Sequence, residues 1–167
     1  MRKSFKPAVD GLEHRVVLSS ISTFFQNTKS DISNLVSKKS STINGTLVGR
    51  YTVEKGAISD AGDTYTFSNL KGNLNKLGNS KGVGTVYSLG FVDKARAPGV
   101  LNITSNKGNV VLVLKGPEQV GFSPLPKTFK YVVSGGKGVG ANFNSTGIVT
   151  LKLTPKGVAT ISIRADS

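Results

Sequence analysis

Two alternating segments close to the end of the chain constrain its fold more than any other feature. Residues 128–134 place Phe129, Tyr131 and Val133 on one face and mostly polar side chains on the other, which is the period of a β-strand with one buried side. Residues 148–154 repeat this alternation after a glycine-dense segment. The two strands can therefore share one hydrophobic layer, which is typical of an all-β protein.

The composition agrees with short strands and tight turns. The chain has 167 residues, including 20 glycines and no tryptophan or cysteine, and 19% of its residues are charged. This length suits one domain with a tail, and the high glycine content favours strands joined by turns over a helical bundle. The lack of cysteine excludes a disulfide framework, a thiolate nucleophile and cysteine-ligated metal sites.

Six further segments carry a strand pattern, and no segment has the period of a crossover helix. They span residues 46–53, 65–74, 83–92, 100–104, 110–115 and 158–164. We predict an all-β fold, namely an antiparallel up-and-down barrel of about eight strands. A barrel is preferred over a sandwich because closure removes the edge strands.

Two details of this pattern make testable structural expectations. The buried positions change from odd numbers at Phe67 to even numbers at Leu70, so a continuous strand needs an extra residue near Ser68–Asn69, as in a β-bulge. Residues 116–126 contain three prolines and form the longest predicted connection.

The start of the chain differs from the rest. We predict a flexible N-terminal tail over residues 1–42 and a β-barrel domain over residues 43–167, because the tail is rich in serine, threonine, asparagine and lysine. Its apolar run from Val16 to Phe25 is interrupted by serines and is too short to span a membrane.

A motif in this tail resembles the N-terminal segment of many planctomycete proteins that are thought to be exported or surface-associated. The motif consists of Phe5, Pro7, Val9, Leu12-Glu13, Arg15 and Leu18-Ser19. The resemblance implies a secreted protein that is extracellular or associated with the cell envelope. It implies nothing about an activity.

The chain is strongly basic, with a net charge of +13 and an isoelectric point near 10.1. Such a charge predicts attraction to polyanions, whether nucleic acid, anionic polysaccharide or an acidic membrane surface. Most of the cations are lysines scattered one per strand or turn, without the clustered arginines and stacking aromatics of nucleic-acid binders. We therefore do not expect nucleic acid as a partner.

No residue pattern indicates a catalytic, cofactor-binding or metal site, and we expect no cofactor. Gly136–Gly140 follows a strand but opens no helix, so it does not match a phosphate-binding loop and is interpreted as a hairpin turn. His14 is the only histidine and lies in the tail, which excludes a Ser-His-Asp triad from the barrel. Asp60 and Asp63 are interpreted as turn residues.

The candidate ligand-binding residues are four tyrosines: Tyr51, Tyr65, Tyr87 and Tyr131. They would line a ligand cavity if their phenols pointed into an open barrel. The alternative is that the rings fill the core, with the hydroxyl groups near the rim.

Residues 128–138, together with Gly147, are similar to the F-x-Y-x-V-x-GGTG…G-x-G hairpin of the allene oxide cyclase and dirigent-type barrels. The resemblance implies an antiparallel barrel that forms oligomers. Four glycines carry over as structural turn or packing residues: Gly135, Gly136, Gly138 and Gly147. No catalytic residue of the family aligns, so the resemblance does not extend its enzymatic activity to this chain.

Together these expectations describe a non-catalytic, exported β-barrel that acts on a surface or in a matrix, or that binds a small apolar or anionic ligand. One alternative is an isomerase or cyclase of the dirigent type, which would steer a reactive small molecule inside the barrel. The other is polyanion binding through the positive charge. Further copies of the chain and cell-envelope components are the other expected partners, and we expect no membrane span.

Overall fold

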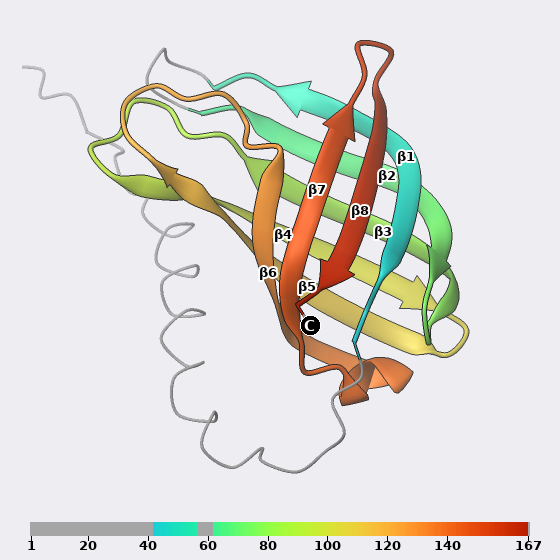
Figure 1. Cartoon of the computed structure of the whole chain (residues 1–167). Coiled ribbons are helices and arrows are strands. Elements are labelled where there is room, and N and C mark those ends of the chain that lie inside the picture. Colours follow the sequence, from blue (N-terminus) through green and yellow to red (C-terminus); the bar gives the residue numbers. More distant parts are fainter. Residues whose placement is uncertain (1–41, 57–61, 167) are drawn as a thin grey trace, which may run out of the picture. The chain divides into compact units, whose positions relative to one another are not determined.

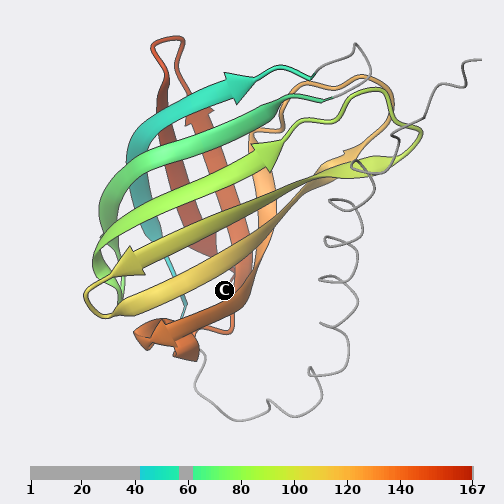
Figure 2. The same ribbon diagram turned by 180° about the vertical axis from the view of Figure 1, so that it is seen from behind.

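The computed structural model describes residues 42–56 and 62–166, which form a closed antiparallel β-barrel (Figures 1 and 2). Eight strands follow one another in chain order, and β1 closes the barrel by pairing with β8. The strands are β1 (Gly45–Glu54), β2 (Thr64–Leu74), β3 (Gly78–Tyr87), β4 (Ala95–Ser105), β5 (Gly108–Gln119), β6 (Thr128–Gly138), β7 (Thr146–Leu153) and β8 (Val158–Ala165). The predicted fold class is confirmed. The predicted tail, apart from Thr42, lies outside the described residues.

Alternate side chains from all eight strands fill the interior of the barrel. Phe67, Phe129 and Tyr131 are its largest members, and none is more than 1% exposed. Leucine and isoleucine side chains surround them, including Leu47, Leu70, Leu101, Ile103, Leu112 and Leu114. A barrel of eight strands is just wide enough for side chains to fill, so a packed hydrophobic core is the physical expectation for this size.

Glycines on the inner face of β3 give room to this core. A Cβ at Gly82 would lie 3.3 Å from Cδ1 of Leu47 and 3.4 Å from Cδ1 of Leu70, and a Cβ at Gly84 would overlap Cδ2 of Leu101. The leucines thus occupy the space in which β3 carries no side chain. As a result, β3 separates the core from the outer surface by little more than its backbone.

The β-bulge predicted near Ser68–Asn69 is confirmed. The register between β2 and β3 shifts between Phe67 and Leu70, and both of these residues face the core. Asn69 adopts a φ of 52°, in the left-handed region that asparagine tolerates better than most residues. Its side chain is exposed on the outer wall.

Several predicted strand boundaries were wrong. β3 begins at Gly78, before the predicted start at Val83, and it ends at Tyr87, well before the predicted end at Val92. Glycines in this segment suggested a turn, but they serve the close packing described above. β6 continues to Gly138 by pairing with β5, so the predicted hairpin turn is partly strand, followed by the short 3-10 helix η2 (Val139–Asn142).

Two prolines that fall outside the predicted strands lie inside strands of the structure. Pro98 belongs to β4 and Pro117 to β5, which extends into the predicted long connection. The register between β4 and β5 shifts between Arg96 and Pro98. A bulge can accommodate a residue that donates no backbone hydrogen bond, which explains why the ladder continues past this point.

Candidate functional site

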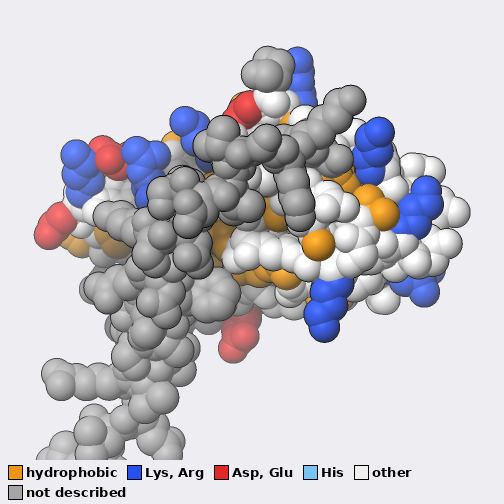
Figure 3. All heavy atoms as spheres, turned by 90° about the horizontal axis from the view of Figure 1, so that it is seen from below, with side chains coloured by type: hydrophobic (Ala, Val, Ile, Leu, Met, Phe, Trp, Pro, Cys, Tyr) orange, Lys and Arg blue, Asp and Glu red, His pale blue; other side chains and the backbone are white. Residues whose placement is uncertain are grey.

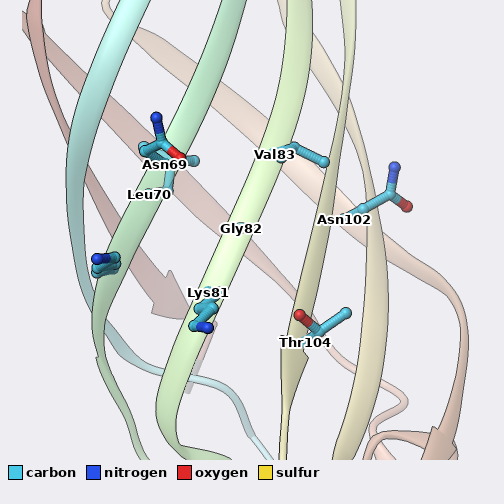
Figure 4. Close-up of a pocket in the computed structure, with 8 residues that line it drawn as sticks. Asn69, Leu70, Lys81, Gly82, Val83, Asn102 and Thr104 are labelled. Atoms are coloured by element: carbon cyan, nitrogen blue, oxygen red, sulfur yellow. The ribbon is translucent and has the colours of Figure 1, made fainter.

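A groove on the outer wall of the barrel crosses β2, β3 and β4 (Figure 4). Its volume is about 370 Å³. The outward-facing residues that line it are Asn69, Lys71, Lys81, Val83, Asn102 and Thr104. Buried Leu70 and Gly82 form the floor of the groove, so the groove lies over the part of β3 where glycines replace inward-facing side chains.

A second groove, of about 340 Å³, adjoins the first and shares Val83 and Asn102 with it. It adds the hydroxyl groups of Thr66, Ser68 and Thr85. We call the two together the outer groove. Its lining of hydroxyl and amide groups, with valine between them, offers hydrogen bonds and some apolar contact along an extended path.

Two lysines stand directly opposite each other at one end of the outer groove. Lys71 of β2 is paired in register with Lys81 of β3, and Lys81 with Thr104 of β4. Like charges in directly opposed positions destabilise a sheet. Within the described residues, neither lysine takes part in an ion pair. The sheet therefore holds two uncompensated positive charges beside a groove of hydrogen-bonding groups.

The ion pairs of the described residues lie away from this site. Lys55 contacts Asp63 at 2.6 Å, and Glu118 contacts two cations of the β3–β4 region. Figure 3 shows Lys and Arg side chains spread over the visible face of the molecule, with fewer Asp and Glu. A second like-charged pair, Lys115 with Lys130, joins β5 and β6 but lines neither of the grooves described above.

The structure brings two of the four candidate tyrosines together. The rings of Tyr51 and Tyr65 are stacked, with centroids 6.4 Å apart and an interplanar angle of 25°. Both are partly buried against the core, and the hydroxyl of Tyr51 donates a hydrogen bond to the carbonyl oxygen of Thr154 at 2.9 Å. Both tyrosines therefore fit the alternative in which the rings fill the core and the hydroxyl groups lie near the rim of the barrel.

The other two tyrosines lie elsewhere. Tyr131 is fully enclosed in the core, its hydroxyl donates to the carbonyl oxygen of Ile43 at 3.4 Å, and burial raises its pKa above the ordinary value. Tyr87 is 41% exposed, on the outer face of β3 that also carries Lys81 and Val83. The four phenols therefore do not surround one common space.

The four glycines from the hairpin resemblance have different surroundings. Gly138 has a φ of 62°, which favours glycine. A Cβ at Gly147 would overlap the carbonyl oxygen of Arg164 and lie 2.7 Å from Cε1 of Tyr131, and one at Gly136 would lie 2.5 Å from the carbonyl oxygen of Asn109. A Cβ at Gly135 would meet no atom within 4 Å.

Asp63, near the β1–β2 connection, has structural partners. Asp63 accepts hydrogen bonds from Lys55 and from the Gly56 amide, and the bond from Lys55 lowers the pKa of Asp63. Asp60 and His14 lie outside the described residues. Within residues 42–56 and 62–166, no cluster of three or more His, Cys, Asp or Glu residues is placed to hold a metal ion.

The outer groove was missed by the reading of the sequence. Lys71 and Lys81 each occupy an ordinary exposed position of an alternating strand, so neither stands out alone. Pairing β2 with β3 through a short turn, with Leu74 opposite Gly78, would have placed the two lysines opposite each other. That signal required the correct start of β3, which the glycines obscured.

Comparisons with known proteins identify no family for the chain. No family model matches the sequence, and no curated protein matches it at a significant level. Among solved structures, pyocyanin demethylase is similar with a TM-score of 0.46 and 16% sequence identity, over 75% of this chain and 100% of that chain. No helix within the described residues combines the length and the apolar character that crossing a bilayer requires.

Proposed function

We propose that this chain is an exported, non-catalytic binding protein whose outer groove holds an acidic polysaccharide. The observation that carries the proposal is the Lys71–Lys81 pair, two uncompensated ammonium groups held in register beside hydrogen-bonding side chains. Two like charges held in register lower the stability of the sheet. A ligand that supplies negative charge at this place would offset that cost.

The filled interior favours a binding role on the outside of the barrel. A cyclase or isomerase of the dirigent type would need an open cavity lined by tyrosine, but buried hydrophobic side chains from every strand meet in the interior. Tyr131 is part of that core rather than the lining of a space. Both grooves described above lie on the outer wall.

The chemistry of the groove selects among the polyanions. The aromatic residue that borders the grooves, Phe67, is fully buried in the core, so the outer groove lacks the exposed stacking platforms that bind the bases of single-stranded nucleic acid. Threonine and serine hydroxyls and asparagine amides match the hydroxyl groups of a sugar chain, and ammonium groups match its carboxylate or sulfate groups. An acidic polysaccharide supplies both.

The remaining parts of the proposal rest on the sequence. The N-terminal motif that resembles planctomycete export segments supports a location outside the cell or at its envelope, where such polymers occur. The glycine hairpin that resembles the allene oxide cyclase and dirigent-type barrels agrees with an eight-stranded barrel as scaffold. Neither resemblance supplies a reaction.

The test is the affinity of the full chain for dextran sulfate, with uncharged dextran as reference, over a series of salt concentrations. The variant Lys71→Gln/Lys81→Gln removes the pair at the groove, and Lys115→Gln/Lys130→Gln removes an equal charge from the matched pair on β5 and β6. We expect the groove variant to lose on the order of tenfold to a hundredfold in affinity at low salt, with a salt dependence reduced by about two charge contacts. The control variant should bind almost as the parent does.

Equal losses in the two variants would show that net charge alone attracts the polymer, and the proposal would fail. Unchanged binding of the groove variant would also contradict it.

A further inference from the structure

Two loops at one end of the barrel carry three strongly exposed apolar side chains. Phe91, in the β3–β4 loop of residues 88–94, is 67% exposed. Val120 and Phe122, in the β5–β6 loop of residues 120–127, are each 68% exposed. We call these three residues the apical tip. Figures 1 and 2 both show the two loops side by side, reaching outward past the end of the barrel wall.

Backbone contacts join the two loops, so the tip is a defined arrangement. Leu89 and Ser123 form an isolated antiparallel bridge, and the amide of Gly121 donates to the carbonyl oxygen of Val92 at 2.7 Å. Gly121 takes a φ of 73°, which allows the sharp change of direction between Val120 and Phe122. The exposure of the apolar side chains therefore does not arise from an unanchored loop.

The charges around the tip suit a negatively charged partner. Glu118, at the base of the tip, is compensated by Lys94 at 3.2 Å and Arg96 at 3.6 Å. Lys127, at the end of the second loop, adds a cation, and Asp93 of the first loop adds an anion, so three cations and two anions lie around the tip. The whole chain carries a net charge of +13, so its long-range field attracts an anionic surface.

We propose that the apical tip inserts into a membrane surface that bears anionic lipid headgroups. The tip is convex, whereas a site for a peptide or small molecule is a hollow lined by the protein. A fluid lipid layer accepts a projecting apolar tip of any shape, and interfacial binding strengthens with the apolar area inserted and with attraction to anionic lipids. The barrel then sits on the membrane as a peripheral protein, with the outer groove free to bind.

A single tryptophan can report this insertion, because the chain contains none. The full chain with Phe122→Trp is mixed with vesicles of phosphatidylcholine and phosphatidylglycerol, or of phosphatidylcholine alone, with and without brominated lipid as a quencher. The control is Val132→Trp, at a residue 54% exposed on β6. We expect a blue-shifted emission and bromolipid quenching for Phe122→Trp with the anionic vesicles, and neither for Val132→Trp.

Adding Phe91→Ser to Phe122→Trp should reduce partitioning into the vesicles on the order of tenfold, because one of the inserted apolar side chains is lost. Adding Lys71→Gln and Lys81→Gln should leave the quenching in place, which separates this inference from the proposed function. Absence of quenching at residue 122, or equal quenching at residues 122 and 132, would overturn the inference. So would a blue shift that grows with protein concentration without vesicles, since a second copy would then cover the tip.

Discussion

Replacing Lys71 by glutamate is expected to stabilise the barrel while it weakens polysaccharide binding. Lys71 and Lys81 are direct partners across β2 and β3, and both side chains are exposed. Opposite charges in such positions contribute about 0.2–1 kcal/mol, and like charges destabilise by a similar amount. Screening by salt and water favours the lower part of this range, so we expect Lys71→Glu to raise the free energy of unfolding by about 0.5 kcal/mol.

The barrel's roughly 120 described residues convert this gain into a small change in melting temperature. An unfolding entropy of about 2.1 cal/mol/K per residue gives a rise of about 2 °C. The assay is thermal unfolding by circular dichroism at low and high salt, beside dextran sulfate binding of the same variant. Since the gain is electrostatic, it should shrink as salt is added.

Lys115→Glu is the matched control, because Lys115 faces Lys130 in the same way. It should gain similar stability and keep its polymer binding. If Lys71→Glu melts at a lower temperature than the parent at low salt, the two lysines do not repel each other and the reasoning is refuted. The same conclusion follows if Lys115→Glu weakens binding as much as Lys71→Glu.

Four further substitutions, one of them a control, test the packing and the ion pair. Gly147→Ala should lower the free energy of unfolding by about 1–3 kcal/mol in chemical denaturation, because the new Cβ would overlap the carbonyl oxygen of Arg164. Gly135→Ala, where the new Cβ meets no atom within 4 Å, should change that free energy by less than about 1 kcal/mol. Equal effects of the two substitutions would contradict this account. Phe67→Ala should cost about 3–5 kcal/mol and expose the core to a hydrophobic dye, and a cost below about 1 kcal/mol would mean that the interior is not packed around this ring. Asp63→Asn should lower the melting temperature at neutral pH, and this difference should shrink as the solution is acidified. The bond from Lys55 lowers the pKa of Asp63 below 3.8, so the carboxylate stabilises the fold above that value and loses its effect as the pH falls through the lower folded pKa. A difference that persists in acid would show that the carboxylate charge is not the cause.

The sequence predicts the architecture of this protein better than its site. Alternation at period two identified most of the strands, and the phase change between Phe67 and Leu70 located the bulge, because both are local properties of the chain. β3 was misplaced since its glycines are explained by distant residues, such as Leu101 against Gly84. A local pattern carries no information about such a neighbour.

The positions of the candidate residues depend on strand register. β3 has apolar residues on both faces, so the sequence did not decide whether Tyr87 points inward, and the structure places it outside. Residues 110–114 are all apolar, a pattern typical of a strand covered on both sides, but Val111 and Val113 on the outer face are only partly buried. The outer groove exists because β2, β3 and β4 align particular exposed residues, which single-strand patterns do not specify.

The most direct test of the central claim is a nuclear magnetic resonance titration of the full chain with a short sulfated oligosaccharide, following the backbone amides. If the outer groove is the binding site, the shifts concentrate at Asn69, Lys71, Lys81, Asn102 and Thr104, and the amides of Tyr51 and Tyr65 stay unchanged. Shifts centred on those two tyrosines, or spread evenly over all lysine-bearing strands, would contradict the claim.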